Sequence, residues 1–292
     1  MRKGLTFYLV LILILAFSFP VLSNDNYDDF DEAEPSAKYY DKAKVIRIKY
    51  VNGESFINRG YNEGVEEAVK NLSIFEGDSA ETTDGRMEIY LGKLNYLRMD
   101  FDTSVKFVTV PELRRTKTTI HLRKGGIYLD ITNLDDEKDI VIQTRDCGLF
   151  LLKEGLYRIN VNENNRTEVF VFDGLAEVAG TDYSRVVREN QKTVMRDGSV
   201  LERPFYFYST ETDGFDSWNK ERTDSQDHSR YSSSRYLNRG YEEYEYELTR
   251  SGRWEYNDEY HTHIWIPYNI GSHWRPYSHG RWVWHPVYGY VW

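Results

Sequence analysis

The sequence predicts an all-β protein, in which a sandwich or roll of short strands is followed by a flexible linker and a small strand-rich module. Short apolar runs recur at roughly ten-residue spacing, and turns rich in Gly, Asp, Asn or Lys separate them. Within each run apolar side chains alternate with polar ones, as expected for a strand with one buried face. No helix of ordinary length fits between the runs. Short strands at this spacing are typical of a sandwich or roll.

The first 23 residues have the pattern of a secretory signal peptide. Arg2 and Lys3 precede an apolar run from Leu5 to Phe19, and Val21-Leu22-Ser23 offers a cleavage site. An uncleaved membrane anchor is the alternative, because about 20 apolar residues span a bilayer. The run is short, so we expect cleavage and a periplasmic or extracellular protein. No Cys follows the run, so a lipid-modified N-terminus is not expected.

Residues 24–43 are predicted to form a solvated acidic spacer. Such a run repels itself and offers little to bury. A calcium site is the alternative, but the spacing lacks the Gly and the distal Glu of a calcium-binding loop. The acids are Asp25, Asp28, Asp29, Asp31, Glu32 and Glu34.

The predicted β-domain spans residues 44–200. Its first strand is marked by Val45, Ile46, Ile48 and Tyr50, and a short helical turn is expected over residues 65–72. Further strands are predicted at 86–91, 120–122, 126–131, 140–142, 156–161 and 168–172. The one cysteine, Cys147, rules out an internal disulfide, so the core must stabilise the domain. We expect Cys147 to be a small packed residue, with a reactive or intermolecular thiol as the alternative.

The apolar pattern stops after Val200, and residues 201–240 are predicted to be a linker. A short amphipathic helix is expected over Phe215–Arg222. The Ser, Asp and Arg-rich stretch that follows cannot bury a core.

Residues 241–292, the aromatic segment, carry six of the seven Trp residues and an internal repeat. Gly252-Arg253-Trp254 recurs as Gly280-Arg281-Trp282, and Ile264-Trp265-Ile266-Pro267 is echoed by Tyr290-Val291-Trp292 with one residue fewer between. We expect about two-thirds of the rings, Trp274 and Tyr277 among them, to form a core, because Trp and Tyr bury large areas. A module of this size can hardly hide them all, so the rest predict a contact surface. The candidate contact residues are Arg253, Trp254, Trp265, Arg281, Trp282 and Trp284.

Histidines and acids of the chain suggest no metal site or catalytic group. His261 and His263 are expected on one face of a strand, but no third ligand completes a zinc site. Asp135, Asp136 and Glu137 are expected to be solvated in a turn. Because nucleophile elbows, zinc-protease motifs and phosphate or dinucleotide loops are missing from the sequence, we expect neither an enzyme nor a cofactor.

The order of several motifs resembles the FecR domain, an extracytoplasmic β-domain of bacterial iron-transport regulators and many other proteins. The matching pieces lie at Glu76-Gly77-Asp78, Thr82 to Arg86, Leu122 to Leu129, Val141 to Thr144, Gly155 to Ile159 and Val171 to Val178. The aromatic segment is similar to Trp/Tyr-rich repeats that follow FecR-like domains in a family of secreted bacterial proteins. That family brings no established activity with it.

Taken together, these patterns favour a non-enzymatic secreted or periplasmic protein that contacts an envelope protein or glycan. A nucleic-acid partner is not expected, because 47 acidic residues outnumber 37 scattered basic ones, giving a net charge of −10. A membrane is expected to be touched only through an uncleaved N-terminal segment. The resemblance implies signalling to a sigma factor as the alternative. Only Met1 to Gly4 precede the apolar run, which disfavours the anti-sigma segment that such regulators carry there.

Overall fold

The computed structural model describes most of the chain after residue 45. The described residues are 46–60, 64–111, 117–134, 136–162, 166–208, 212–225, 236–237, 244–271, 273–275, 277–278, 280–285 and 289–292. The predicted signal peptide and acidic spacer lie outside them. In these ranges, no helix combines the length and apolar character needed to cross a membrane.

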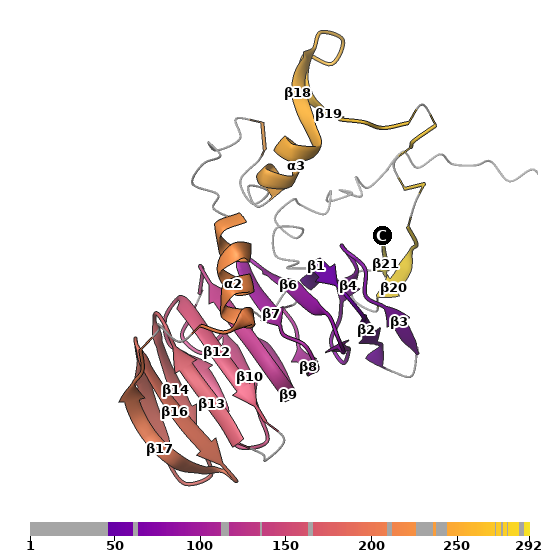
Figure 1. The fold of residues 1–292 in the computed structure, drawn as a ribbon. Helices are drawn as coiled ribbons and strands as arrows, with labels where there is room; N and C mark the ends of the chain where they lie inside the picture. Colours follow the sequence, from indigo (N-terminus) through magenta and orange to yellow (C-terminus); the bar gives the residue numbers. More distant parts are fainter. Residues whose placement is uncertain are drawn as a thin grey trace, which may run out of the picture. The chain divides into compact units, whose positions relative to one another are not determined.

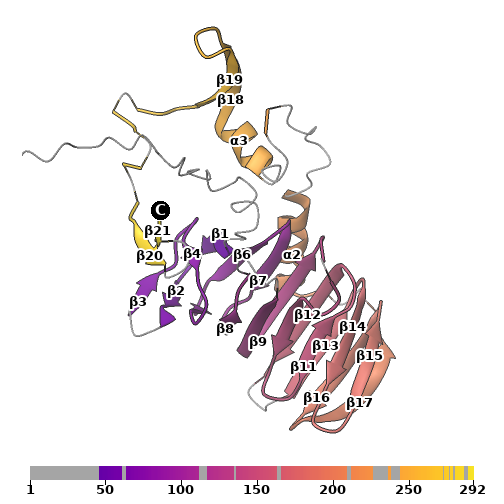
Figure 2. The ribbon, with the colours of Figure 1, turned by 180° about the vertical axis from the view of Figure 1, so that it is seen from behind.

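Two sheets form the β-domain, and one long strand, β9 (Thr118–Ile131), belongs to both (Figures 1 and 2). Neighbouring strands are antiparallel except β9 and β10, which are parallel. Sheet A has the order β4 (Ser73–Ile74), β1 (Ile46–Asn52), β6 (Arg86–Gly92), β7 (Asn95–Met99), β9, β12 (Gly155–Val161), β13 (Arg166–Val171), β16 (Gln191–Arg196) and β17 (Ser199–Tyr206). Sheet B has the order β3 (Val65–Glu67), β2 (Ser55–Asn58), β5 (Ser79–Thr82), β8 (Thr103–Thr109), β9, β10 (Ile140–Gln143), β11 (Gly148–Leu151), β14 (Leu175–Ala179) and β15 (Ser184–Arg188).

Strand β9 replaces the two separate strands predicted at 120–122 and 126–131. Its first half pairs with β8 and β10 in sheet B, and its second half pairs with β7 and β12 in sheet A. The change of sheet falls at Gly125, whose φ of +87° favours glycine. A Cβ at this position would lie 2.3 Å from Oγ1 of Thr103, so a side chain has no room there. A glycine inside a strand often marks such a bend.

One hydrophobic core lies between the sheets and contains side chains from both. On β6 the inward side chains Met87, Ile89 and Leu91 are at most 3% exposed, and Leu149 and Leu151 on β11 meet the same core. The alternation read from the sequence therefore marks the inner faces of a sandwich, and the all-β prediction is confirmed.

The short helical turn expected over residues 65–72 is wrong. This stretch begins with β3, which pairs with β2, and Ala68 donates its backbone N–H to the carbonyl oxygen of Ser55 at 2.9 Å. Asn71 then turns the chain with a φ of +67°. Residues 65–67 form a strand instead of a helical turn because β2 provides hydrogen-bond partners for their backbone N–H and C=O groups.

Ordered elements continue past residue 200, where the composition predicted a flexible linker. Strand β17 extends sheet A to Tyr206, and the expected helix is present as α2 (Gly214–Ser225). Asp213 caps this helix by accepting N–H bonds from Phe215 and Asp216, while Asp216 Oδ2 accepts the N–H of Asp213 in return. This reciprocal pair is a capping box. Strand β17 and helix α2 lie within the residues predicted as a linker, and the division of the chain into domains stays a prediction.

Cys147 is a packed residue of the core, as expected. Its side chain is 7% exposed, and burial raises the pKa of the thiol to about 11, although a hydrogen-bond contact with Thr144 opposes this. A thiol is nucleophilic only as the thiolate, so this environment disfavours reactivity.

Candidate functional site

The aromatic segment begins its described part with helix α3 (Glu245–Ser251) and an antiparallel hairpin of β18 (Gly252–Asn257) and β19 (Thr262–Pro267). Trp254 and Trp265 are directly opposite each other on the two strands. Trp265 is partly buried, and its Nε1–H donates to the carbonyl oxygen of Leu248 at 2.9 Å. Such cross-strand ring pairs stabilise antiparallel strands.

The glycine of the repeated Gly-Arg-Trp unit has a packing reason. A Cβ on Gly252 would lie 2.5 Å from Cε2 of the Trp265 indole and 2.4 Å from the carbonyl oxygen of Ile266. Real Cβ atoms do not come so close, so the indole can cover this position only because it is glycine. An aromatic ring packed over a strand glycine is a known stabilising device of β-structure.

The second copy of the repeat has the same arrangement. β20 (Val283–His285) pairs with β21 (Gly289–Val291), and a Cβ on Gly280 would lie 2.6 Å from Cζ2 of the Trp292 indole. Trp292 thus covers Gly280 as Trp265 covers Gly252. The sequence repeat is therefore a structural repeat, in which one glycine and one Trp form each packing pair.

Three rings of the second copy form an exposed cluster, which we call the ring cluster: Tyr277, Trp282 and Trp292. The Tyr277 and Trp282 rings are stacked with centroids 5.6 Å apart, and Trp292 meets them edge to face at 5.4 and 5.2 Å. Trp282 is 53% exposed and Tyr277 66%. The expectation that Tyr277 and Trp274 form a core is wrong, because Trp274 is also 42% exposed. Among the segment's described side chains, no Trp or Tyr is fully buried.

The other candidate contact residues fall into different environments. Trp254 is partly buried, with its ring centroid 5.5 Å from that of Tyr236. Arg253 is exposed and pairs with Glu255 at 2.5 Å, and this hydrogen bond raises the pKa of the guanidinium. Arg281 is exposed and forms an ion pair with Glu66. Trp284 belongs to β20, and its side chain lies outside the described part.

The two histidines expected on one strand face do not share one. His261 lies in the turn before β19 with a φ of +48°, whereas His263 is in β19 and packs 4.2 Å from the Tyr236 ring, centroid to centroid. The strand starts one residue too late to place both side chains on it. Within the described ranges, no group of three or more His, Cys, Asp or Glu side chains could hold a metal ion.

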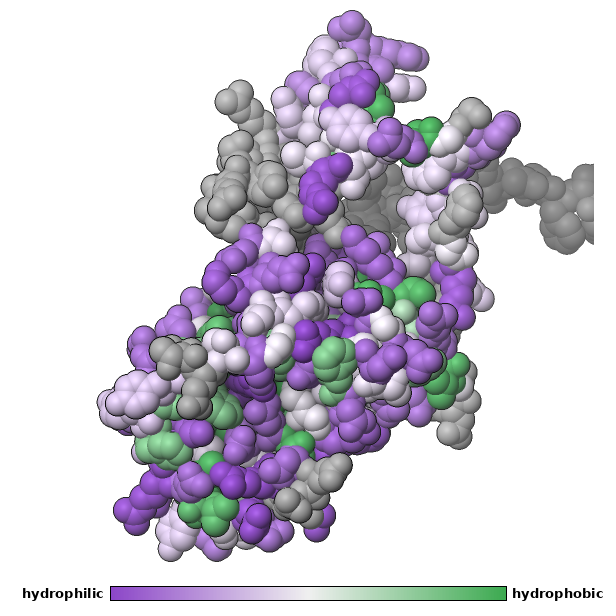
Figure 3. Space-filling view, in the orientation of Figure 1, coloured by the Kyte–Doolittle hydropathy of each residue, from purple (hydrophilic) through white to green (hydrophobic). Residues whose placement is uncertain are grey.

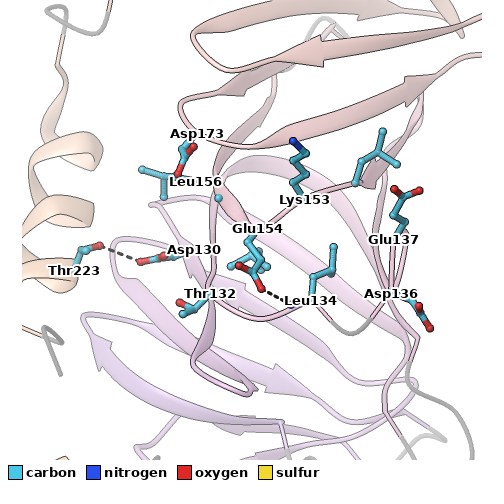
Figure 4. Close-up of a pocket in the computed structure, with 13 residues that line it drawn as sticks. Asp130, Thr132, Leu134, Asp136, Glu137, Lys153, Glu154, Leu156, Asp173 and Thr223 are labelled. Carbon is cyan, nitrogen blue, oxygen red and sulfur yellow. Dashed lines mark hydrogen bonds between the residues drawn. The ribbon is translucent and has the colours of Figure 1, made fainter. Parts of the chain in front are cut away.

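Two surfaces of the β-domain were not predicted from the sequence. A cavity of about 1000 Å³ is lined by Asp130, Asp136, Glu137 and Lys153, with Thr223 of α2 donating to Asp130 Oδ2 at 3.1 Å (Figure 4). The predicted turn acids therefore line a cavity, although Asp135 itself lies outside the described residues.

The second surface is a groove of about 430 Å³ on the outer side of sheet A. Phe170 of β13 and Phe172, just after this strand, each contact Phe207 edge to face there, and Lys192 lies 5.0 Å from the Phe170 ring centroid. Figure 3 shows apolar side chains among polar ones over this end of the sheet. The predicted strand at 168–172 carries a signal for this groove, because Phe170 and Phe172 alternate with the core residues Val169 and Val171.

Replacing Gly252 by Ala should selectively loosen the first hairpin. The new methyl group collides with the Trp265 indole and a backbone oxygen, and overpacking of this kind costs about 1–3 kcal/mol. Hydrogen exchange of the β18 and β19 amides should speed up accordingly. Gly271→Ala is the matched control, because a Cβ there meets nothing within 4 Å. Equal exchange in both variants would disprove the packing role of Gly252.

No protein-family model matches the sequence, and the comparison with curated proteins gave no match. Two crystal structures of a putative anti-sigma factor from Parabacteroides distasonis ATCC 8503 are similar in fold to part of the chain, at TM-scores of 0.38 and 0.37 and identities of 14% and 11%. Each match covers 44% of this chain and 59% of that protein's chain, so this chain spans less than two-thirds of its length. The likeness is a partial, distant likeness of fold.

Proposed function

We propose that this protein is a non-enzymatic cell-envelope protein that acts through protein or glycan contacts made by its aromatic segment. The observation that carries the proposal is the ring cluster, in which Trp282 and Tyr277 stay more than half exposed while they contact each other and Trp292. Grouped exposed rings are costly to keep in water unless a partner covers them. Trp, Tyr and Arg are also the residue types that dominate binding energies at interfaces.

The structural roles in the repeat narrow the expected contact residues. Trp265 and Trp292 each cover a glycine, so we assign their rings to the packing of the two hairpins. The rings of Trp282 and Tyr277 do not cover a glycine and are exposed. The side chains of Arg253 and Arg281 are also exposed, one in each copy of the repeat. Rings that are already held by neighbouring rings lose little freedom on binding, which favours affinity. We therefore place the centre of the contact at Trp282.

The β-domain, in this proposal, is a FecR-like scaffold that presents the aromatic segment outside the cytoplasm. The ordered motifs between Glu76 and Val178 and the signal-peptide pattern of residues 1–23 support this assignment. A packed sandwich gives the segment a stable point of attachment.

The experiment uses the immobilised full chain and a cell-envelope fraction. Trp282→Ala should weaken capture about 30-fold or more, because a central ring at an interface contributes about 2 kcal/mol or more. Tyr183→Ala is the matched control, since this ring is 68% exposed but belongs to the β-domain. Circular dichroism checks that both variants stay folded.

Treating the envelope fraction first with protease or with periodate separates the two partner classes. Loss of capture after protease identifies a protein, and loss after periodate identifies a glycan. If the full chain retains nothing, or if Trp282→Ala and Tyr183→Ala retain equal amounts, the proposal is wrong.

A further inference from the structure

Helix α2 lies on the outer face of sheet A, over strands that place charged side chains on that face (Figure 1). The residues that alternate with the core positions of β6, β7, β9 and β12 are polar there: Glu88, Arg98, Asp130 and Arg158. Glu88 and Arg98 are 0% exposed beneath the helix. Burial of charge is expensive unless partners satisfy it, so the contacts of α2 decide how the helix is held.

The C-terminal half of α2 is held by hydrogen bonds and ion pairs. Arg98 Nη1 donates to Oδ1 of Asn219 at 2.5 Å and to Oγ1 of Thr223 at 2.9 Å. Arg222 Nη2 donates to Oε1 of Glu88 at 2.8 Å, and its guanidinium lies 4.4 Å from the Tyr50 ring centroid. Each of these contacts joins the helix to the sheet through a polar or charged group.

The N-terminal half is held in the same way. Arg158 donates to Oδ2 of Asp213 at 2.6 Å and to Oδ1 of Asp216 at 2.5 Å, and the Tyr128 hydroxyl also donates to Asp216. Burial is the largest single effect and raises the pKa of Asp213, but the hydrogen bond and charge of Arg158 and the N–H groups of Asp216 and Phe215 together outweigh it and lower that pKa to about 2. Asp213 is therefore ionised at neutral pH and attracts Arg158.

The apolar part of this contact comes from two aromatic side chains of α2, Phe215 and Trp218, and Trp218 is partly buried with its ring centroid 6.1 Å from that of Tyr50. Phe215 is the one apolar side chain of α2 that is fully buried, packing edge to face on Tyr128 with centroids 5.0 Å apart. The two sheets, by contrast, share a continuous apolar core. Interfaces of mainly polar character resemble transient ones, and local openings concentrate where few apolar contacts hold an element.

The charges of the sheet keep partners when the helix leaves. Arg98 Nε still donates to Glu88 at 2.8 Å, and Arg98 Nη2 still pairs with Asp130 at 3.1 Å. When α2 detaches, this face of the sheet becomes exposed and water replaces the hydrogen bonds that the helix made. No charged group is then left buried without a partner. We propose that α2 can detach from sheet A while the sandwich stays folded, and we call the helix a releasable clamp.

The clamp limits how far the aromatic segment can reach once the Arg47–Tyr244 hydrogen bond and the Arg281–Glu66 ion pair have also opened, a consequence that depends on the function proposed above. With α2 docked, 18 residues lie between Ser225 and Tyr244; with α2 released, 37 lie between Tyr206 and Tyr244. An extended chain spans at most about 3.5 Å per residue, so release raises the upper limit from about 60 Å to about 130 Å. With those two contacts open, release of α2 roughly doubles the maximal distance between the β-domain and the segment.

The test is hydrogen exchange of the full chain, read separately for α2 and for β7 and β12. Arg222→Gln removes a contact to Glu88, and Gln has nearly the same helix propensity as Arg. The α2 amides should exchange about tenfold faster or more in this variant, with unchanged β7 and β12 amides, because a charged hydrogen bond is lost. High salt should act in the same direction by screening the partly exposed pairs.

Lys220→Gln is the matched control, since Lys220 is 75% exposed and forms an ion pair with Asp224 of the same helix. It should leave exchange within about twofold of the parent chain. Exchange of α2 in step with β7 and β12, or equal effects of the two variants, overturns the clamp. This readout does not use capture, so it stands or falls separately from the proposed function.

Discussion

Arg98→Met should lower the free energy of unfolding of the β-domain by about 3–5 kcal/mol, because it leaves Glu88 buried without its main partner. Both side chains are 0% exposed, and the Arg98 Nε–Glu88 Oε2 distance is 2.8 Å. The guanidinium also serves Asp130 and Asn219, so its loss frees polar groups on both the sheet and α2. Urea denaturation of the full chain measures the change, with the slope checked for constancy.

Two further variants test the reason for this loss. Arg188→Met removes an exposed arginine of β15 and should change stability by less than about 0.5 kcal/mol. The double variant Glu88→Leu, Arg98→Met removes the stranded charge and should recover part of the loss. A single variant that costs under about 1 kcal/mol, or a double variant less stable than the single one, would contradict a buried ion pair.

Asp78→Ala should destabilise the β-domain by a similar amount, about 3–5 kcal/mol, because this carboxylate joins three separate groups. It is 3% exposed, accepts the N–H of Gly60 at 2.9 Å and that of Phe75 at 3.0 Å, and forms an ion pair with Arg59. Without it, two backbone donors lose their acceptor and the buried guanidinium of Arg59 loses one of its two carboxylate partners, keeping Glu66. Thermal and urea unfolding should show the loss.

Asp78→Asn separates shape from charge in this position. The amide keeps one acceptor oxygen but loses the charge that balances Arg59, so its effect should fall between those of the parent and Asp78→Ala. Asp182→Ala, at an exposed position, is the control and should be nearly neutral. If Asp182→Ala and Asp78→Ala cost the same, Asp78 has no special place in the fold.

The strands could be predicted where one face is buried. The alternation of buried and less buried side chains in β6 and β12 follows from the two-residue period of a strand. This period is a local property and does not depend on how the strands are connected. Strand β9 was divided in the prediction because Gly125 looks like a turn, and only pairing with both sheets shows that it is a bend. The helical turn over 65–72 failed for the same reason, since the pairing of β3 with β2 is not local.

The candidate site was found in part. The repeat of Gly-Arg-Trp was visible in the sequence, but the ring that covers each glycine lies 13 residues on in the first copy and 12 in the second. Which Trp packs and which Trp is exposed depends on the hairpin register, so the sequence could not separate Trp265 from Trp282. The roles of the six predicted contact residues stay predictions until binding is measured.

The sequence alone determined what depends on neighbours along the chain: the all-β class, the positions of most strands, the short helix that contains Phe215 and the repeat in the aromatic segment. The tertiary structure decided what depends on residues far apart. Composition placed α2 in a linker because it carries few apolar residues, yet Arg98 binds Asn219 across 121 positions and Arg222 binds Glu88 across 134. The sequence predicted the helix itself, but its attachment to the sheet could not be predicted, because most of its partners are single polar groups that only the folded sheet brings together.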